Sequence, residues 1–372
     1  MSDLYPADRL ARAQQATAAA GLDALLLTPG ADLRYLTGYP ALPLERLTCL
    51  AVPADGDPFL VVPRLERPAA QASPAGGLGL DIAAHEETDD AYRLVAGRLR
   101  QALGREPQRV GLANRMWAEQ VVAFRGALPG AAQELAGDVL RELRIRKTPE
   151  EVAALRRAGE AIDRVHRRMG EWLKPGRTEA EVGRDIAEAI TAEGHATTNF
   201  VIVGSGPNGA SPHHATSDRV IERGDTVVVD IGGITADGYC SDCTRTYAIG
   251  TVSDEFRAAY DVLAQAQAAA CAAVRPGVAA WEVDAAARDI IAAAGYGDYF
   301  IHRTGHGIGL EEHEEPWIVA GNTERLQPGM AFSIEPGIYL PGRHGARIED
   351  IVVCTEDGVD RLDDVTRELV VL

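Results

Sequence analysis

Residues 226–246 read TVVVDIGGITADGYCSDCTRT, which is two strand-like runs joined by a turn. The first run contains Asp230, the segment GITADG is typical of a hairpin turn, and the second run contains Asp242. Neighbouring strands of a hairpin bring opposed side chains together. The stretch therefore predicts a β-hairpin that presents two carboxylates at one point.

Three more polar residues stand in apolar or turn settings farther along the chain. They are His306 in GHGIG, Glu335 in FSIEPG and Glu349 in ARIED. Burying four carboxylates together is costly unless cations compensate them. Four carboxylates and one imidazole form an oxygen-rich set suited to Mn²⁺ or Co²⁺, with Zn²⁺ or Fe²⁺ as alternatives, and too large for one tetrahedral zinc. We expect two ions roughly 3.5–4 Å apart.

The second part of the chain contains an internal repeat. Sliding the segment after residue 173 by 101 positions onto the segment after 274 aligns six identities. They pair Pro175 with Pro276, Gly176 with Gly277, Glu181 with Glu282, Val182 with Val283, Ile190 with Ile291, and Gly194 with Gly295. A glycine also stands six residues before Asp230 and six before Glu335. The repeat predicts two copies of a helix, helix, hairpin unit that share one centre.

The first part of the chain alternates helical and strand patterns, which predicts a small α/β domain. We expect helices at 5–20, 88–103 and 115–128, strands at 22–28, 47–53, 58–62 and 109–112, and a loop at 68–80. The charged segment RELRIRKTPEE then leads to Thr148 and Pro149, which are typical of a helix start. We predict domains at 1–140 and 141–372.

Composition narrows the function classes. A chain of 372 residues at 46% hydrophobic content can bury the cores of about two domains. Its 37 basic and 55 acidic residues give a net charge of -18, which disfavours nucleic acid as a partner. The N-terminus lacks a positively charged leader, and no apolar run reaches the roughly 18 residues of a membrane span. We expect neither secretion nor a membrane partner.

Five cysteines, an odd and widely spread number, argue against a disulfide framework and favour a cytoplasmic location. Cys240 and Cys243 form a CxxC, but they flank Asp242 within a predicted strand and lack a partner pair. We do not expect a redox or zinc role for them.

A GxGxxG pattern at Gly204, Gly206 and Gly209 follows a predicted strand. Dinucleotide binding would require a helix next, whereas the following residues ASPHHATSD show no helical periodicity. We do not expect a dinucleotide site.

Several motifs together resemble the metal-dependent peptidases of the pita-bread fold, family M24, and in particular the prolidase and aminopeptidase P branch. They are SDCTRT, HRTGHGIGLEEHEEP, SIEPGIY and RIED, while AAGLDALLLT and RYLTGY resemble the N-terminal domain of that branch. The resemblance spans almost the whole chain. It implies an α+β pita-bread catalytic domain with a pseudo-two-fold repeat, preceded by a smaller α/β creatinase/prolidase-type domain.

The resemblance also implies roles for the metal-binding residues. Asp230 would bind one ion, His306 and Glu335 the other, and Asp242 and Glu349 both. The expected cofactors are two divalent ions, Mn²⁺ first and Co²⁺ or Zn²⁺ as alternatives.

Three histidines match family positions around the substrate. His213 corresponds to a histidine that faces the substrate, and His313 to the imidazole that contacts the scissile carbonyl. His302 corresponds to a histidine of the proline pocket, with a structural role as the alternative. His214 stands where relatives often carry glycine, and we assign it no role.

Arg347 lies two residues before Glu349, on the same face of a regular strand. It is expected to pair with an aspartate or with a substrate carboxylate.

One departure from the family pattern concerns the hairpin. Asp230 and Asp242 are twelve residues apart, one more than the commoner family spacing. We expect the additional residue in the turn at 235–238, because a one-residue shift in the strand would point one carboxylate away.

The resemblance implies hydrolysis of Xaa-Pro bonds by a metal-bridging hydroxide, with Glu335 as the proton shuttle and a homodimeric assembly. The short N-terminal part favours an Xaa-Pro dipeptidase over an aminopeptidase P, which acts on longer peptides. Metal-free amidinohydrolysis of the creatinase type and a catalytically inactive protein-binding module are further alternatives. The complete ligand set argues against both.

Overall fold

The computed structural model describes residues 4–372. The chain forms two compact units, residues 1–144 and 145–372. The described residues form one sheet in the first unit and three in the second, and each unit has hydrophobic core clusters of its own.

The first unit is built on one mixed six-stranded sheet in the order β4-β3-β2-β1-β5-β6. The strands are β1 (Ala24–Leu27), β2 (Cys49–Pro53), β3 (Phe59–Pro63), β4 (Asp81–His85), β5 (Arg109–Leu112) and β6 (Ala132–Leu135). Strand β2 runs antiparallel to both of its neighbours, whereas the other pairs are parallel. Alternation along β1 directs Ala24 and Leu26 into the core that α4 and α5 complete.

The helices of the first unit are α1 (Asp8–Ala19), α2 (Ala31–Thr37), α3 (Arg67–Ala72), α4 (Ala91–Leu103), α5 (Ala118–Ala127) and α6 (Gly137–Arg144). The expectation of a loop at 68–80 is wrong. That stretch contains most of α3 and the short 3₁₀ turn η2 (Pro74–Gly77), because Pro68 is tolerated in the first turn of α3 and its alanines continue the helix. The helices α2 and α6 and the strands β4 and β6 were not predicted; β4 and β6 are the edge strands of the sheet, and their sequences DIAAH and AQEL lack a run of large apolar residues.

The second unit begins with α7 (Pro149–His166), α8 (Met169–Trp172) and α9 (Glu179–Ala192). As the sequence predicts, Thr148 caps α7, and its side chain forms a capping box with Glu151. These helices precede β7 (His195–Ser205), the 3₁₀ turn η3 (Gly206–Ala210), β8 (Thr226–Thr235) and β9 (Cys240–Ala248). The strands form a sheet in the order β17-β9-β8-β7, which β17 (Val370–Val371) completes.

The second half of this unit repeats that arrangement. Its helices are α10 (Asp254–Ala273) and α11 (Ala280–Ala293), followed by the 3₁₀ turn η4 (Gly297–Tyr299). Its five-stranded sheet has the order β11-β10-β12-β15-β16. Between β12 and β15 in the sequence, β13 and β14 form a separate two-stranded hairpin. These strands are β10 (Gly305–Gly307), β11 (Glu314–Ile318), β12 (Ala331–Ile334), β13 (Gly337–Leu340), β14 (His344–Arg347), β15 (Asp350–Cys354) and β16 (Val359–Arg361). Helices α9 and α11 begin and end 101 residues apart, so the predicted repeat is confirmed.

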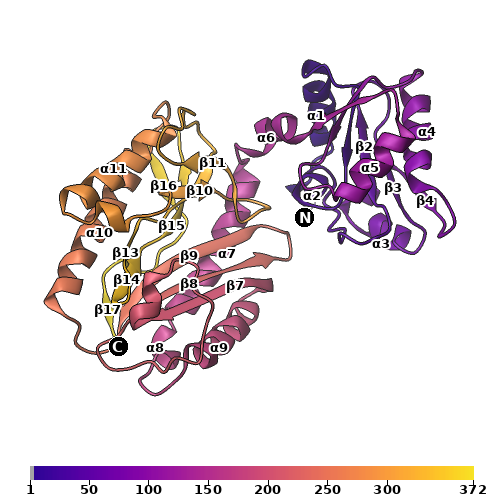
Figure 1. The fold of residues 1–372 in the computed structure, drawn as a ribbon. Coiled ribbons are helices and arrows are strands. Elements are labelled where there is room, and N and C mark those ends of the chain that lie inside the picture. The colour runs from indigo at the N-terminus through magenta and orange to yellow at the C-terminus, as the bar shows by residue number, and fades with distance from the viewer. Residues whose placement is uncertain (1–3) are drawn as a thin grey trace. The chain divides into compact units, whose positions relative to one another are not determined.

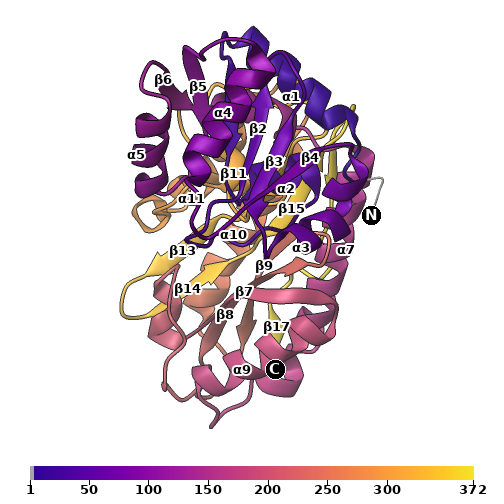
Figure 2. The same cartoon turned by 90° about the vertical axis from the view of Figure 1, so that its right-hand side faces the viewer.

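Each sheet of the second unit turns one face toward its helices. On β8, Val227, Val229 and Ile231 enter the core formed with α7 and α9. On β12, Phe332 and Ile334 enter the core formed with α10 and α11. Figure 1 shows the strands of this unit between these two pairs of helices, and Figure 2 shows β7 and β8 beside α9. Residues that alternate with these core positions point away from the helices, toward the space between the sheets.

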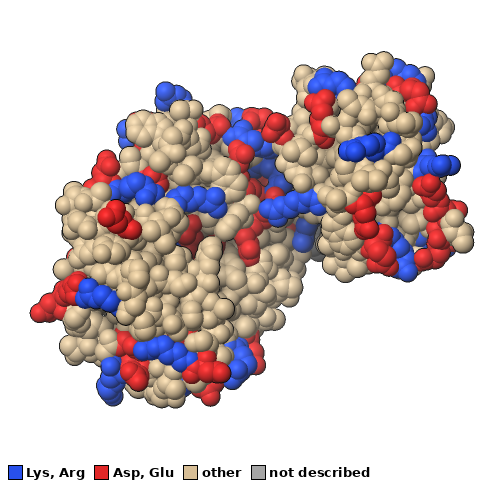
Figure 3. Space-filling view, viewed as in Figure 1, with Lys and Arg blue, Asp and Glu red and all other residues tan. Residues whose placement is uncertain are grey.

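The described residues carry charges of both signs on their surface. On the face in Figure 3, acidic and basic side chains are interspersed over each unit. No helix among residues 4–372 is long and apolar enough to cross a membrane. All five cysteines are buried and free.

Candidate metal centre

The hairpin of β8 and β9 presents Asp230 and Asp242 on one face. The two strands pair without a shift, with Asp230 opposite Thr244 and Gly232 opposite Asp242. Cys243 lies in the helix-side core, so its neighbour Asp242 points to the other face, as Asp230 does. The additional residue of the hairpin is therefore accommodated in the turn between the strands, as expected, and does not shift the register.

His306, Glu335 and Glu349 reach the same place from the second half of the unit. His306 lies on β10, Glu335 directly follows β12, and Glu349 directly precedes β15. The neighbours Ile334 and Ile348 are both in the helix-side core, which directs the two glutamates to the opposite face. The alternation of the strands thus brings the five residues together.

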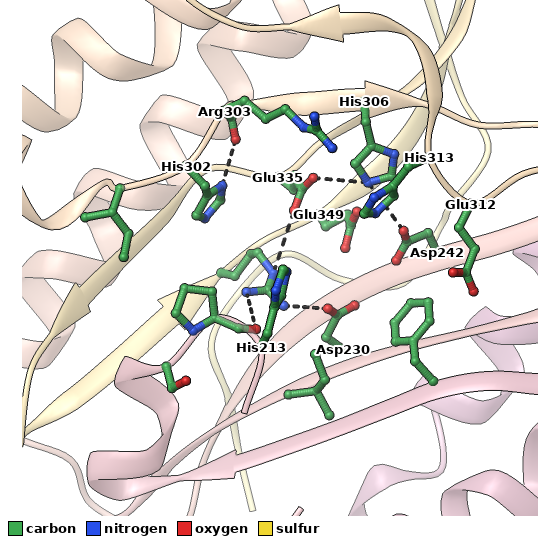
Figure 4. A pocket seen from close by; sticks show the side chains of 16 residues that line it. His213, Asp230, Asp242, His302, Arg303, His306, Glu312, His313, Glu335 and Glu349 are labelled. Atoms are coloured by element: carbon green, nitrogen blue, oxygen red, sulfur yellow. Dashed lines mark hydrogen bonds and ion pairs between the residues drawn. The ribbon is translucent and has the colours of Figure 1, made fainter. Parts of the chain in front are cut away.

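The distances within this cluster are short enough for shared cations. Nε2 of His306 lies 3.2 Å from Oε1 of Glu335 and 3.6 Å from Oδ2 of Asp242. Ligand atoms of Asp230, Asp242 and Glu349 lie within 4.8 Å of one another, and the same holds for His306, Glu335 and Glu349. Figure 4 shows these side chains converging from both sheets.

Two carboxylate oxygens in the cluster have no hydrogen-bond partner. Oδ1 of Asp230 and Oε1 of Glu349 are buried and unpaired among residues 4–372. The other oxygen of Glu349 accepts a hydrogen bond from the Thr244 hydroxyl at 2.6 Å. Unpaired buried acceptors are costly, and a bound cation would satisfy them. The residues present therefore fit a site for divalent ions.

The hydrogen bonds of His306 also suit metal binding. Its Nδ1 lies 3.2 Å from the Gly307 carbonyl, which can only accept, so Nδ1 carries the proton. Nε2 faces Asp242 and Glu335, and in the ion-free site it shares a proton with Glu335 that a cation would replace, which would leave the ring protonated at Nδ1 alone. This is the tautomer that a metal-binding histidine needs.

Crowding of the carboxylates perturbs their pKa values. Burial and then the negative charge of Glu349 raise the pKa of Asp242 well above its usual value. Burial and the charge of Glu335 do the same to the pKa of Glu349. Burial also opposes ionisation of Glu335, but the hydrogen bond and charge of His306 outweigh it and lower the pKa of Glu335 to about 2. Without cations, the cluster is thus relieved of part of its charge by protons.

Arg347 is a buried partner of the cluster. Its Nη2 donates to Oδ2 of Asp230 at 2.5 Å, and its Nε donates to the Thr244 hydroxyl at 3.0 Å. Its Nη1 donates to the Tyr339 hydroxyl at 2.8 Å. Of the two predicted partners for Arg347, an aspartate or a substrate carboxylate, this structure contains the aspartate.

His302 and Tyr339 support each other at the edge of the site. Nδ1 of His302 donates to the Arg303 carbonyl at 2.7 Å, and Nε2 lies 2.8 Å from the Tyr339 hydroxyl. Burial lowers the pKa of His302, so the ring is neutral and its Nε2 accepts from Tyr339. Both ring nitrogens are engaged, which favours the structural alternative for His302. Tyr339 was not predicted, because its hydroxyl meets Arg347 and His302 only through the fold.

The loop between η3 and β8 holds His213, which is exposed and lines the cavity. The neighbouring His214 donates its Nε2 proton to the buried carboxylate of Glu179 at 2.7 Å. Glu179 also accepts from the hydroxyls of Ser205 and Ser217, each at 2.6 Å. His214, for which the sequence suggested no role, thus ties this loop to α9. Glu179 was missed because it occupies the first turn of a helix, where a glutamate is ordinary.

His313 stands next to His306, with their ring centroids 3.9 Å apart. Burial, followed by the charge of His306, lowers the pKa of His313 to about 4. His313 faces the same cavity as the carboxylates (Figure 4). It therefore shares the cavity with the clustered carboxylates.

A cavity of about 770 Å³ opens onto the cluster. It is lined by the five clustered residues, by the predicted His213, His302, His313 and Arg347, and by Phe200, Ile202, Ser211, Pro212, Ile301, Arg303 and Glu312. Its volume suits a dipeptide or a short peptide. Apolar side chains lie beside charged ones, as in sites for small ligands.

The two disfavoured motifs lack the geometry that their sites would need. Cys240 and Cys243 point to opposite faces of β9, so they cannot bind one ion together. After Gly204 the chain continues into η3 and a loop and not into an α-helix, so no helix N-terminus is available for a pyrophosphate.

Comparison with known proteins agrees with this architecture. Residues 153–356 match the model of metallopeptidase family M24, and residues 9–146 match the creatinase/prolidase N-terminal domain. A duplicated unit around a carboxylate and histidine cluster, preceded by such a domain, defines a pita-bread metallopeptidase. The chain belongs to metallopeptidase family M24, as the sequence motifs predicted.

Individual relatives are similar over nearly their whole length. The probable dipeptidase PepE of Mycobacterium tuberculosis is 56% identical over 366 residues, which cover 98% of this chain and 96% of that protein. The Xaa-Pro dipeptidase of Lactobacillus helveticus is 37% identical, with coverage of 91% and 92%. The crystal structure of dipeptidase PepE from Mycobacterium ulcerans has a TM-score of 0.92 at 56% identity, with coverage of 98% and 97%.

Proposed function

We propose that the chain is an Xaa-Pro dipeptidase that depends on two divalent ions, Mn²⁺ being the first candidate. The observation that carries the proposal is the cluster of four carboxylates and His306, with buried unpaired oxygens, at the base of a cavity of about 770 Å³. The similarity to proteins named dipeptidase and Xaa-Pro dipeptidase supports the substrate class.

In this proposal Asp230 holds one ion, and His306 and Glu335 hold the other. Asp242 and Glu349 serve both, which is supported by their membership of two overlapping groups of close ligand atoms. Bound ions would activate water and polarise a carbonyl at neutral pH. Donor chemistry alone allows Co²⁺ and Zn²⁺ as well as Mn²⁺.

The protein side chains then handle protons and orientation. Glu335 accepts the proton of the attacking water and passes it to the departing nitrogen. A proline nitrogen has no N–H in the peptide and must be protonated as it leaves. His313 and His213 line the cavity, where either imidazole can donate to the oxyanion of the tetrahedral intermediate.

The proline ring is proposed to lie near His302, Tyr339 and Arg347. Hydrogen bonds of 2.8 Å connect Tyr339 to each of the other two, so this wall is held in one arrangement. A preorganised wall lowers the ordering cost of binding a small rigid ring.

The test uses protein stripped with a chelator and reloaded with Mn²⁺, Co²⁺ or Zn²⁺. We expect hydrolysis of Ala-Pro and not of Ala-Pro-Pro, and loss of activity after chelation and in Glu335→Gln. Glu356→Gln, an exposed glutamate away from the cavity, is the matched control. Cleavage of Ala-Pro-Pro alone would favour aminopeptidase P, and activity that survives chelation would favour metal-free hydrolysis.

Assembly and location stay predictions. A homodimer is expected from the family resemblance, and sedimentation analysis would test it. A cytoplasmic location is expected from the cysteine content, and fractionation of the source cells would test it.

A further inference from the structure

Two arginines line the cavity, and their environments differ. Arg347 is 2% exposed, and its donors are engaged by Asp230, Thr244 and Tyr339. A group whose hydrogen bonds are already made within the protein gains little from a ligand. Arg347 is thus poorly suited to bind a charged group of the substrate.

Arg303 is partly exposed and has a different set of neighbours. Its guanidinium carbon lies 4.3 Å from the ring centroid of Trp317. Trp317 is the residue opposite His306 in the pairing of β10 with β11, so the stack is fixed beside the metal centre. Figure 4 shows the side chain of Arg303 extending toward His306 and Glu335.

The positive charge of Arg303 is not neutralised by a direct contact. Within residues 4–372, no carboxylate forms an ion pair with it, and its guanidinium donates no hydrogen bond to the protein. Partial burial lowers the pKa of Arg303, and the more distant charge of Glu335 opposes this effect. A guanidinium stacked on an aromatic face keeps the N–H groups along its edge available. Such an edge matches the two oxygens of a carboxylate.

We propose that Arg303 binds a carboxylate of the substrate. The inference rests on the proposed peptidase function and adds a residue that selects among its substrates. A dipeptide offers two sources of this chemistry, the C-terminal carboxylate and an acidic side chain on the residue before proline. Either carboxylate would pair with the Arg303 guanidinium, which is otherwise partly removed from water without a counter-charge beside the metal centre.

The experiment compares wild type, Arg303→Met and Arg303→Lys on Ala-Pro, Ala-Pro amide, Glu-Pro and Gln-Pro. Methionine keeps an apolar side chain against Trp317 and removes the charge, whereas lysine keeps the charge and loses the paired N–H groups. Arg257→Met, an exposed arginine on α10 outside the cavity, controls for the change in net charge. Thermal unfolding of each variant confirms that it is folded.

Each source of the carboxylate predicts a separate pattern. If Arg303 binds the C-terminal carboxylate, Arg303→Met raises KM for Ala-Pro by about 10- to 100-fold and abolishes the preference for Ala-Pro over its amide. If it binds the acidic side chain, the variant abolishes a preference of the same size for Glu-Pro over Gln-Pro. The lysine variant is expected to lie between methionine and wild type. Equal kcat/KM for all four substrates in wild type and variant, or an equal loss on all four, would overturn the proposal.

Failure of the proposed dipeptidase function would give a different result from failure of the proposal for Arg303. If loaded wild type hydrolyses none of the four substrates, the dipeptidase proposal fails. Calorimetric titration of wild type and Arg303→Met with the same four compounds then decides the role of Arg303. A preference for the carboxylate form that the variant lacks supports the inference, and identical binding by both proteins refutes it.

Discussion

Nη2 of Arg347 donates a 2.5 Å hydrogen bond to Oδ2 of Asp230, across two strands that belong to different halves of the repeat. Both side chains are buried, at 2% and 8% exposure. The pair fixes the orientation of one carboxylate of the cluster and leaves its other oxygen facing the site. Several consequences follow for stability and for metal binding.

Removing Arg347 should destabilise the metal-free protein strongly. Breaking one side of a buried ion pair leaves an uncompensated charge and costs about 3–5 kcal/mol. Urea unfolding of Arg347→Met in chelator should show a loss of this size. Arg343→Met, which breaks an exposed pair with Glu255, should lose far less, because water screens an exposed pair. Equal losses in the two variants would contradict the role given to Arg347.

Asp242→Asn should change stability in opposite directions with and without metal. In chelator the variant should be at least as stable as wild type, because asparagine replaces a carboxyl group whose ionisation is opposed by burial and by the charges of Glu349 and Asp230. In saturating Mn²⁺, wild type should gain about 3–4 kcal/mol and the variant much less. Thermal unfolding in chelator and in Mn²⁺ compares the stability of the two proteins under both conditions. A variant that Mn²⁺ stabilises as much as wild type would refute Asp242 as a ligand.

Glu179→Gln should impair catalysis without changing the metal content. Glu179 holds the loop that carries His213, through Ser205, Ser217 and His214. A shift of this loop by about an ångström can lower kcat/KM by roughly 10- to 100-fold. Elemental analysis should find the same ions as in wild type. Glu181→Gln on the same helix, which alters only a capping box, should stay within a few-fold of wild type.

His166 should make the protein less stable in acid. Burial, then the charge of Arg245, lowers the pKa of His166 to about 3, from an ordinary value near 6.5. The folded state therefore binds fewer protons than the unfolded state. The contribution of His166 to the free energy of unfolding is complete above the pKa that His166 has in the unfolded chain. It is lost as the pH falls toward the lower pKa of the folded state. From about pH 7.5 to about pH 5 the loss is about 2 kcal/mol. Urea unfolding in chelator should show that His166→Gln loses less over this range than wild type, and parallel curves would exclude the effect.

The convergence of the five clustered residues could be predicted because each lies in a strand or directly beside one, where alternation sets the direction of the side chain. The helix start at Thr148 and the repeat that relates α9 to α11 could likewise be predicted from the local sequence. Tyr339, Glu179 and the unpaired state of Arg303 could not be predicted. Their partners are 8 to 38 residues away or absent among the described residues, so only the folded chain defines their environment.

The prediction of a loop at 68–80 was wrong for a related reason. Proline, glycine and alanine in one stretch indicate a turn when counted together. Here Pro68 stands at the start of α3 and the alanines continue the helix, so position within the segment decided the structure.

The five-residue cluster is proposed to bind two divalent ions. Calorimetric titration of chelator-stripped wild type with Mn²⁺, at a protein concentration fixed by absorbance, tests it most directly. We expect about two ions per chain in wild type and a lower stoichiometry in Asp242→Asn and Glu349→Gln. Folded wild-type protein that binds no Mn²⁺, Co²⁺ or Zn²⁺, or variants that bind as many ions as wild type, would contradict it.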